Sequence, residues 1–163
     1  MQENNVVTLP CVTEEGLLEG VITIGDITKS YMNLYDSSII SKACTKYANI
    51  LDTLEGSMVV GDSEAYFDRG KVLIAAANPD LMENYIEKHD LVILGNRYES
   101  QLCAIEMEAG CIIVCEGAGV SLTIRKLAQE RGCAVITTPY DTYTTARLIN
   151  QSMPISYFMT KEN

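Results

Sequence analysis

The chain has 163 residues, of which 47% are hydrophobic, and this is enough to bury the core of one globular domain with a small appendage. Its 22 acidic residues outnumber 12 basic ones, and a net charge of -10 opposes the phosphates of nucleic acid, which we therefore exclude as a partner. No apolar run approaches the roughly 18 residues of a membrane span, and the start lacks the features of a signal peptide. We therefore expect a cytoplasmic protein that makes no membrane contact.

The cysteines and the single histidine, His89, set the limits for metal and disulfide chemistry. No two cysteines form a C-x-x-C pair, so the sequence predicts no zinc site and no other metal site. We interpret the cysteines as reduced and mostly buried thiols, which fits a reducing compartment. They are Cys11, Cys44, Cys103, Cys111, Cys115 and Cys133.

The first third of the chain predicts a hairpin followed by two helices. Residues 6–12 and 17–24 are strand-like, and the polar stretch TEEG lies between them. Helical spacing then covers residues 26–34 and again about residues 39–54, where it ends before Gly56.

After Gly56, short apolar strands alternate regularly with helical patterns. This alternation is typical of an α/β fold, so we predict a doubly wound, mostly parallel sheet with helices on both faces. The expected strands are 58–60, 71–77, 90–94, 111–115 and 133–137, and the expected helices are 79–88, 99–109, 120–131 and 142–151.

The stretch GVITIGDITKSYM places Thr23 and Asp26 around a turn from strand to helix. A carboxylate there can accept two ribose hydroxyls, while the amides and the positive dipole end of the helix suit a phosphate. The alternative is structural: Asp26 caps a helix that begins at Ile27, and Thr23 is present because β-branched residues favour strands. Spacing alone favours the structural interpretation.

Two further stretches lie where open α/β sheets usually bind ligands. VCEGAGVSLTIRKL is a strand, a glycine-rich turn and a helix, but it matches neither a Walker loop nor a dinucleotide fingerprint, so Ser121 is expected near a helix start. Asn96, Arg97, Asp141 and Thr142 follow predicted strands at the carboxyl edge of the sheet. For Asp141 and Thr142 we favour helix capping over ligand binding.

The sequence offers no catalytic constellation. His89 lies in the polar stretch EKHD, at a predicted helix end where it would interact with the helix dipole, and the carboxylates are not clustered. We therefore predict no catalytic residue and no enzyme activity for this chain.

Several motifs resemble a known family. LPCVTEEGLLEGVITIGDITKSYM is similar to the second half of a CBS motif, with its L-P-x-V strand and T-x-x-D ending. Residues 56–152 resemble a DRTGG domain, through GNRYESQLCAIEMEAGCIIVCEGAGVS and ITTPYDTYTTARLINQSMPI, although YDTYT departs from the name-giving letters. PISYFMT resembles the opening of a second CBS motif. This order resembles the regulatory region of CBS-containing manganese-dependent (family II) inorganic pyrophosphatases.

The resemblance implies a division into residues 1–55, the second half of a CBS motif with a linker helix, residues 56–152, a DRTGG domain, and residues 153–163, the start of another CBS motif. In that family, CBS motifs bind AMP and ADP as inhibitors and ATP or diadenosine polyphosphates as activators. Manganese belongs to separate catalytic domains that this chain does not contain. By this resemblance Thr23 would contact phosphate or ribose, and Asp26 would contact the ribose hydroxyls.

We therefore expect a non-catalytic regulatory module that binds adenine nucleotides through its CBS elements. It would form a homodimer through the DRTGG domain and control the pyrophosphatase catalytic domains of a full-length parent. The alternative is a dimerisation or scaffold domain that binds no ligand, in which a partner covers the strand edges of the hairpin.

Overall fold

The computed structural model describes residues 1, 3–32 and 36–159. The chain forms two compact units: residues 1–36 together with 154–163, and residues 37–153. The division into segments 1–55, 56–152 and 153–163 stays a prediction.

The first unit contains the expected hairpin. Strand β1 (Thr8–Val12) pairs antiparallel with β2 (Leu18–Thr23), followed by helix α1 (Ile24–Met32), and the later segment adds a short 3-10 helix, η3 (Ile155–Tyr157). Thr13 organises the turn, because its hydroxyl accepts the amides of Glu15 and Leu17 at 3.2 Å each. Gly16 completes the turn at φ +85°, a conformation that glycine adopts without steric cost.

The second unit holds the α/β body. Its elements in chain order are α2 (Ile39–Lys42), β3 (Thr45–Lys46), α3 (Tyr47–Leu54), β4 (Ser57–Val60), β5 (Tyr66–Phe67), β6 (Val72–Ile74), α4 (Pro79–Met82), β7 (Leu91–Leu94), α5 (Tyr98–Glu106), β8 (Cys111–Val114), α6 (Leu122–Arg131), β9 (Ala134–Thr137), α7 (Thr142–Leu148) and η2 (Ile149–Ser152).

The main sheet has five strands in the order β4-β9-β8-β7-β6. The pairs β6–β7, β7–β8 and β8–β9 are parallel, and β4 joins β9 antiparallel at one edge. This confirms the predicted mostly parallel sheet. Consecutive strands from β6 to β9 are neighbours, so the strand order does not reverse between them. In many open α/β sheets the ligand crevice lies at such a reversal, and these four strands therefore do not form one.

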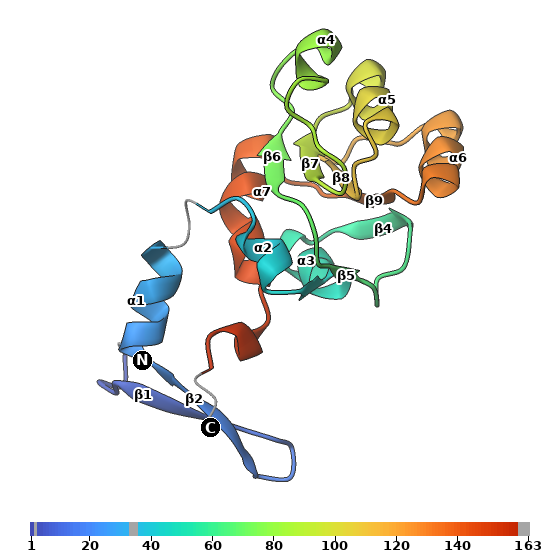
Figure 1. Ribbon diagram of the computed structural model, residues 1–163. Coiled ribbons are helices and arrows are strands. Elements are labelled where there is room, and N and C mark those ends of the chain that lie inside the picture. Colours follow the sequence, from blue (N-terminus) through green and yellow to red (C-terminus); the bar gives the residue numbers. More distant parts are fainter. Residues whose placement is uncertain (2, 33–35, 160–163) are drawn as a thin grey trace. The chain divides into compact units, whose positions relative to one another are not determined.

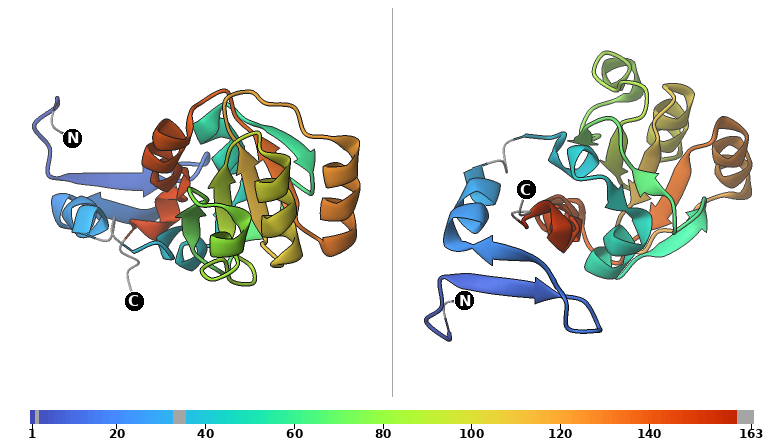
Figure 2. Two further views of the ribbon diagram at one scale, coloured as in Figure 1. Left: turned by 90° about the horizontal axis from the view of Figure 1, so that it is seen from above. Right: turned by 60° about the horizontal axis from the view of Figure 1, so that its bottom comes forward.

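Helices cover both faces of this sheet, as predicted. The crossover helices α4, α5 and α6 lie on one face, whereas α3 and α7 lie on the other (Figures 1 and 2). Strand residues alternate between these layers. Ile112, Val114 and Val135 pack toward α5 and α6, while Ile113 and Ile136 alternate with them, also fully buried, toward the opposite layer.

The single helix expected over about residues 39–54 is wrong. Helix α2 ends at Lys42, Cys44 takes a left-handed conformation at φ 51°, and β3 intervenes before α3 begins. Two interactions explain the break: Thr45 pairs with Phe67 of β5, and its hydroxyl donates to the Ile40 carbonyl at 2.8 Å.

The helix expected over residues 79–88 is also too long, since α4 ends at Met82. The Glu87 amide donates to the Asp90 carboxylate at 2.8 Å rather than continuing a helical pattern. His89 then adopts φ 73°, so it lies in a left-handed turn and not at the helix end that the sequence predicted.

Candidate functional site

Thr23 and Asp26 meet where β2 turns into α1. The Thr23 amide and hydroxyl both donate to Oδ2 of Asp26 at 2.8 Å, and the Asp26 amide donates back to the Thr23 hydroxyl oxygen at 3.2 Å. Helix α1 begins at Ile24, so Thr23 is the residue that precedes its first turn and Asp26 is the third residue within it. This reciprocal pattern is a capping box.

The structure confirms that Asp26 takes part in capping and corrects two details of the prediction: the helix begins at Ile24, and Thr23, which was attributed to strand propensity, is the cap residue. The sequence analysis placed Asp26 as the cap of a helix beginning at Ile27, whereas Thr23 occupies the cap position and Asp26 returns the hydrogen bond. The T-x-x-D spacing produces this arrangement, because the third helical residue can reach back to the cap amide.

Both side chains are partly buried, and Ile24 beside them is 47% exposed. A carboxylate can accept about four hydrogen bonds through its two oxygens. The Asp26 carboxylate is thus fixed in orientation at the positive end of a helix.

Two polar residues at the carboxyl edge of the main sheet, Asp141 and Ser121, act as helix caps. Oδ1 of Asp141 accepts the Thr144 amide at 2.6 Å at the start of α7, and hydrogen bonds from Thr144 lower the pKa of Asp141. Ser121 caps α6 by accepting the Ile124 amide at 3.2 Å. The predicted capping is confirmed for Asp141 and wrong for Thr142, which is the first residue of α7 and not its cap.

Arg97 occupies the position before α5, but its side chain makes no capping hydrogen bond there. Asn96 lies in the same loop after β7, and both residues are exposed. Asn96 and Arg97 belong to the second unit, whereas Thr23 and Asp26 belong to the first.

Sequence reasoning missed the role of Glu116. This residue adopts φ 64° directly after β8, and its amide donates to the Tyr140 carbonyl at 2.8 Å. Gly117 continues the left-handed turn at φ 63° and donates to Thr138 at 2.8 Å. These bonds tie the loop after β8 to the loop after β9. The glycine-rich run was the available signal, but it pointed to Gly117 and not to the residue before it.

Residues 1, 3–32 and 36–159 contain no group of three or more histidine, cysteine or acidic side chains that could hold a metal ion. In the same part of the chain, no helix combines the length and the apolar character needed to cross a membrane.

A family model described as the DRTGG domain matches residues 49–152. A crystal structure of the CBS and DRTGG domains of the regulatory region of Clostridium perfringens pyrophosphatase, complexed with the activator diadenosine tetraphosphate, is also similar. The two share 36% sequence identity at a TM-score of 0.87, over 100% of this chain and 71% of the solved one.

Two curated relatives agree with this match. A cobalt-dependent inorganic pyrophosphatase of Clostridium perfringens is 37% identical over 163 residues, which are 100% of this chain and 30% of the relative. A probable manganese-dependent inorganic pyrophosphatase of Thermotoga maritima is 26% identical over 162 residues, or 99% of this chain and 29% of the relative. The chain therefore spans somewhat less than a third of these relatives, and it matches the regulatory region rather than the catalytic domain.

Proposed function

Because the chain belongs to the DRTGG domain family, we propose that it is a regulatory region that binds an adenine nucleotide and thereby controls a metal-dependent inorganic pyrophosphatase. The observation that carries this proposal is the similarity of the whole chain to a regulatory region solved with diadenosine tetraphosphate, at a TM-score of 0.87. Cobalt or manganese would serve the catalytic domain of the parent enzyme, and AMP, ADP or ATP are the other candidate ligands.

Within this proposal, Thr23 and Asp26 form one half of the nucleotide site. The Asp26 carboxylate accepts the ribose hydroxyls, and the Thr23 hydroxyl contacts ribose or phosphate. Their capping box supports these roles, since two hydrogen bonds of 2.8 Å hold the carboxylate in place before any ligand arrives. A preoriented acceptor loses less conformational freedom on binding than a mobile one.

The DRTGG domain, residues 56–152, would bring two copies of the chain together. Three large apolar side chains support a contact at the carboxyl edge of the sheet: Tyr98, Leu122 and Tyr143 are 42%, 66% and 71% exposed, and each lies in the first turn of a helix. Nucleotide binding would shift the position of the two copies, with a coupling free energy of about 1 to 3 kcal/mol. The free thiols of all six cysteines fit action in the cytoplasm.

Isothermal titration calorimetry of the chain with diadenosine tetraphosphate, AMP and ATP tests the nucleotide site. We expect saturable binding of at least one of them and a loss of about tenfold or more in Asp26→Asn, because a hydrogen bond to a charged acceptor contributes roughly 1.5 to 3 kcal/mol.

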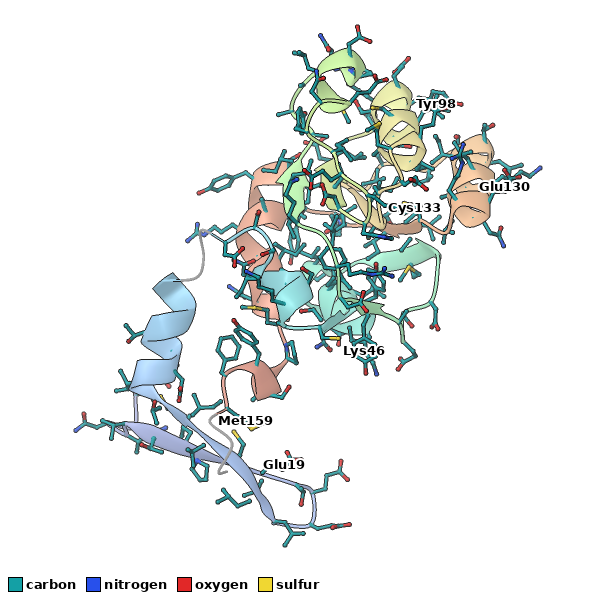
Figure 3. The ribbon with its side chains drawn as sticks, viewed as in Figure 1. Glu19, Lys46, Tyr98, Glu130, Cys133 and Met159 are labelled. Carbon is teal, nitrogen blue, oxygen red and sulfur yellow. The ribbon has the colours of Figure 1, made fainter. Side chains whose placement is uncertain are left out.

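The matched control is Glu19→Gln, which removes one negative charge from the exposed part of β2 (Figure 3). It should leave binding unchanged. Equal losses of nucleotide affinity in the two variants would mean that Asp26 acts only through its negative charge and not through a contact with the ligand. Absence of binding by all three nucleotides would count against the site.

Sedimentation velocity tests the dimer separately. We expect the wild-type chain to sediment as a dimer and Tyr143→Glu to sediment as a monomer, because a carboxylate in an apolar contact loses its hydration. A monomeric wild-type chain at working concentration would contradict the dimerisation proposal.

A further inference from the structure

A cavity of about 510 Å³ opens in the second unit, at the edge of the main sheet where β8 and β9 begin. This edge lies opposite the carboxyl ends of the parallel strands. Its apolar wall includes Val59 and Val60 of β4, Ala128 of α6 and Ala134 of β9. The volume falls within the range of small-molecule sites, roughly 300 to 1,000 Å³, and the lining is divided nearly evenly between polar and apolar surface.

Tyr47 gives the cavity a polar group that the fold does not use. This first residue of α3 lines the cavity and is only 8% exposed. No described residue makes a hydrogen bond with the Tyr47 hydroxyl group. Every fully buried side-chain oxygen and nitrogen among these residues has a hydrogen-bond partner, so the Tyr47 hydroxyl is not fully buried. Tyr47 is one of the residues that line the cavity.

The Tyr47 phenol remains protonated under ordinary conditions. Burial raises its pKa, and the neighbouring Cys111, Cys133 and Asp68 raise the pKa further. A protonated phenol can donate one hydrogen bond and accept others. Cys133, labelled between the sheet and α6 in Figure 3, also lines the cavity.

The charges around the cavity disfavour an anion. Asp62 is the one charged side chain among the described residues that line it. Helix α6 ends beside the cavity at Gly132, so the negative end of its dipole faces this region. Lys46 lies close to Asp62, but its ammonium group is paired with Glu64 at 2.8 Å.

From this geometry we propose that the cavity binds a small planar nitrogen compound that is neutral or positively charged. The Tyr47 hydroxyl and the Asp62 carboxylate are its polar partners, while the apolar wall contacts its ring. The site lies wholly within residues 37–153 and is independent of the proposed nucleotide site at Thr23 and Asp26.

Three probes of nearly the same shape and different charge test the proposal: benzamidine, benzamide and benzoate. In amide-resolved NMR titrations of the full chain, benzamidine and benzamide should cause saturable shifts at Tyr47, Gly61 and Gly132. Benzamidine should bind more tightly because it pairs with Asp62, and benzoate should cause no saturable shift.

Variants separate the two polar contacts. Tyr47→Phe keeps the ring and should weaken benzamidine and benzamide alike by about threefold or more. Asp62→Asn should remove the advantage of benzamidine over benzamide and leave benzamide unchanged. Glu130→Gln, on the exposed surface of α6 (Figure 3), is the charge control and should have no effect.

Ala65→Leu places extra volume on the cavity wall and should block the probes. No saturable shift up to the solubility limit, benzoate binding as tight as benzamidine, or full affinity in Tyr47→Phe would each overturn the proposal. None of these outcomes bears on nucleotide binding, which has its own titration.

Discussion

Removal of the buried carboxylate of Asp90 should strongly destabilise the second unit. Its side chain is 2% exposed, and it accepts the Lys71 amide at 3.0 Å through Oδ1 and the Glu87 amide at 2.8 Å through Oδ2. The Lys71 ammonium lies 3.5 Å from Oδ2. One carboxylate thus joins the segment before β6 to the turn before β7.

Replacement of Asp90 by alanine leaves two backbone amides without their acceptor. Each charge-assisted bond contributes roughly 1.5 to 3 kcal/mol, so two of them give about 3 to 5 kcal/mol after partial relaxation by water. The Lys71 ion pair adds little, because the Lys71 side chain is 33% exposed and solvent screens its charge. We expect Asp90→Ala to lower the free energy of unfolding by about 3 to 5 kcal/mol.

Urea unfolding followed by far-ultraviolet circular dichroism measures this loss. The midpoint should fall while the dependence on denaturant stays constant. Glu87→Gln is the control: the Glu87 carboxylate contacts the Lys71 ammonium at 3.3 Å but is 76% exposed, so we expect a change within about 0.5 kcal/mol. A loss below about 1 kcal/mol in Asp90→Ala would refute the reasoning, since the two amides would then be satisfied by other means.

Two further outcomes follow from contacts elsewhere in this unit. Gly70→Ala should lower the thermal midpoint sharply, because Gly70 has a φ of +92° and an added Cβ would overlap the His89 carbonyl oxygen. Gly119→Ala is the control and should leave the midpoint nearly unchanged, because the space around its Cβ is open. Equal shifts in the two variants would contradict the steric argument. Burial raises the pKa of Cys133 from 9.0 to about 12, so its thiol loses its proton at a lower pH in the unfolded chain than in the folded one. The contribution of Cys133 to the free energy of unfolding should therefore fall as the pH rises from 9.0 to about 12. Denaturant midpoints measured from pH 8 to 10 check the sign of this contribution, Cys133→Ala serves as the control, and an identical pH slope in both proteins would count against it.

The strands were predictable because their residues are apolar without interruption. Ile112 and Ile113 are buried on opposite faces of the sheet, and such runs indicate strands covered by helices on both sides. The antiparallel direction of β4 was not predictable, because a run of apolar residues carries no sign of strand direction. The break at Cys44 was equally hidden, since it depends on the pairing of Thr45 with Phe67, far away in the sequence.

The predicted length of helix α4 was wrong because a side chain competes with the backbone for a hydrogen bond. The residues after Met82 have helical spacing, but the Asp90 carboxylate takes the Glu87 amide. The cavity beside Tyr47 could not be predicted at all, because its walls come from α3, β4, α6 and β9, and no local pattern brings these elements together. By contrast, the T-x-x-D spacing did indicate capping, since both partners lie within four residues, although the sequence analysis assigned the cap to Asp26 and not to Thr23.

The capping box also decides how the nucleotide experiment must be interpreted. Asp26 accepts two hydrogen bonds from Thr23, so its replacement weakens the start of α1 by about 0.5 to 2 kcal/mol even if no ligand ever contacts it. A loss of binding in Asp26→Asn could therefore arise from a frayed helix. The helical signal separates the two effects, and Thr23→Ser is the reference with an intact box, because serine keeps the hydroxyl that completes the box and removes only a methyl group. If Thr23→Ser binds nucleotide normally while Asp26→Asn does not, and both retain the helical signal of the wild type, the lost contact is between the carboxylate and the ligand.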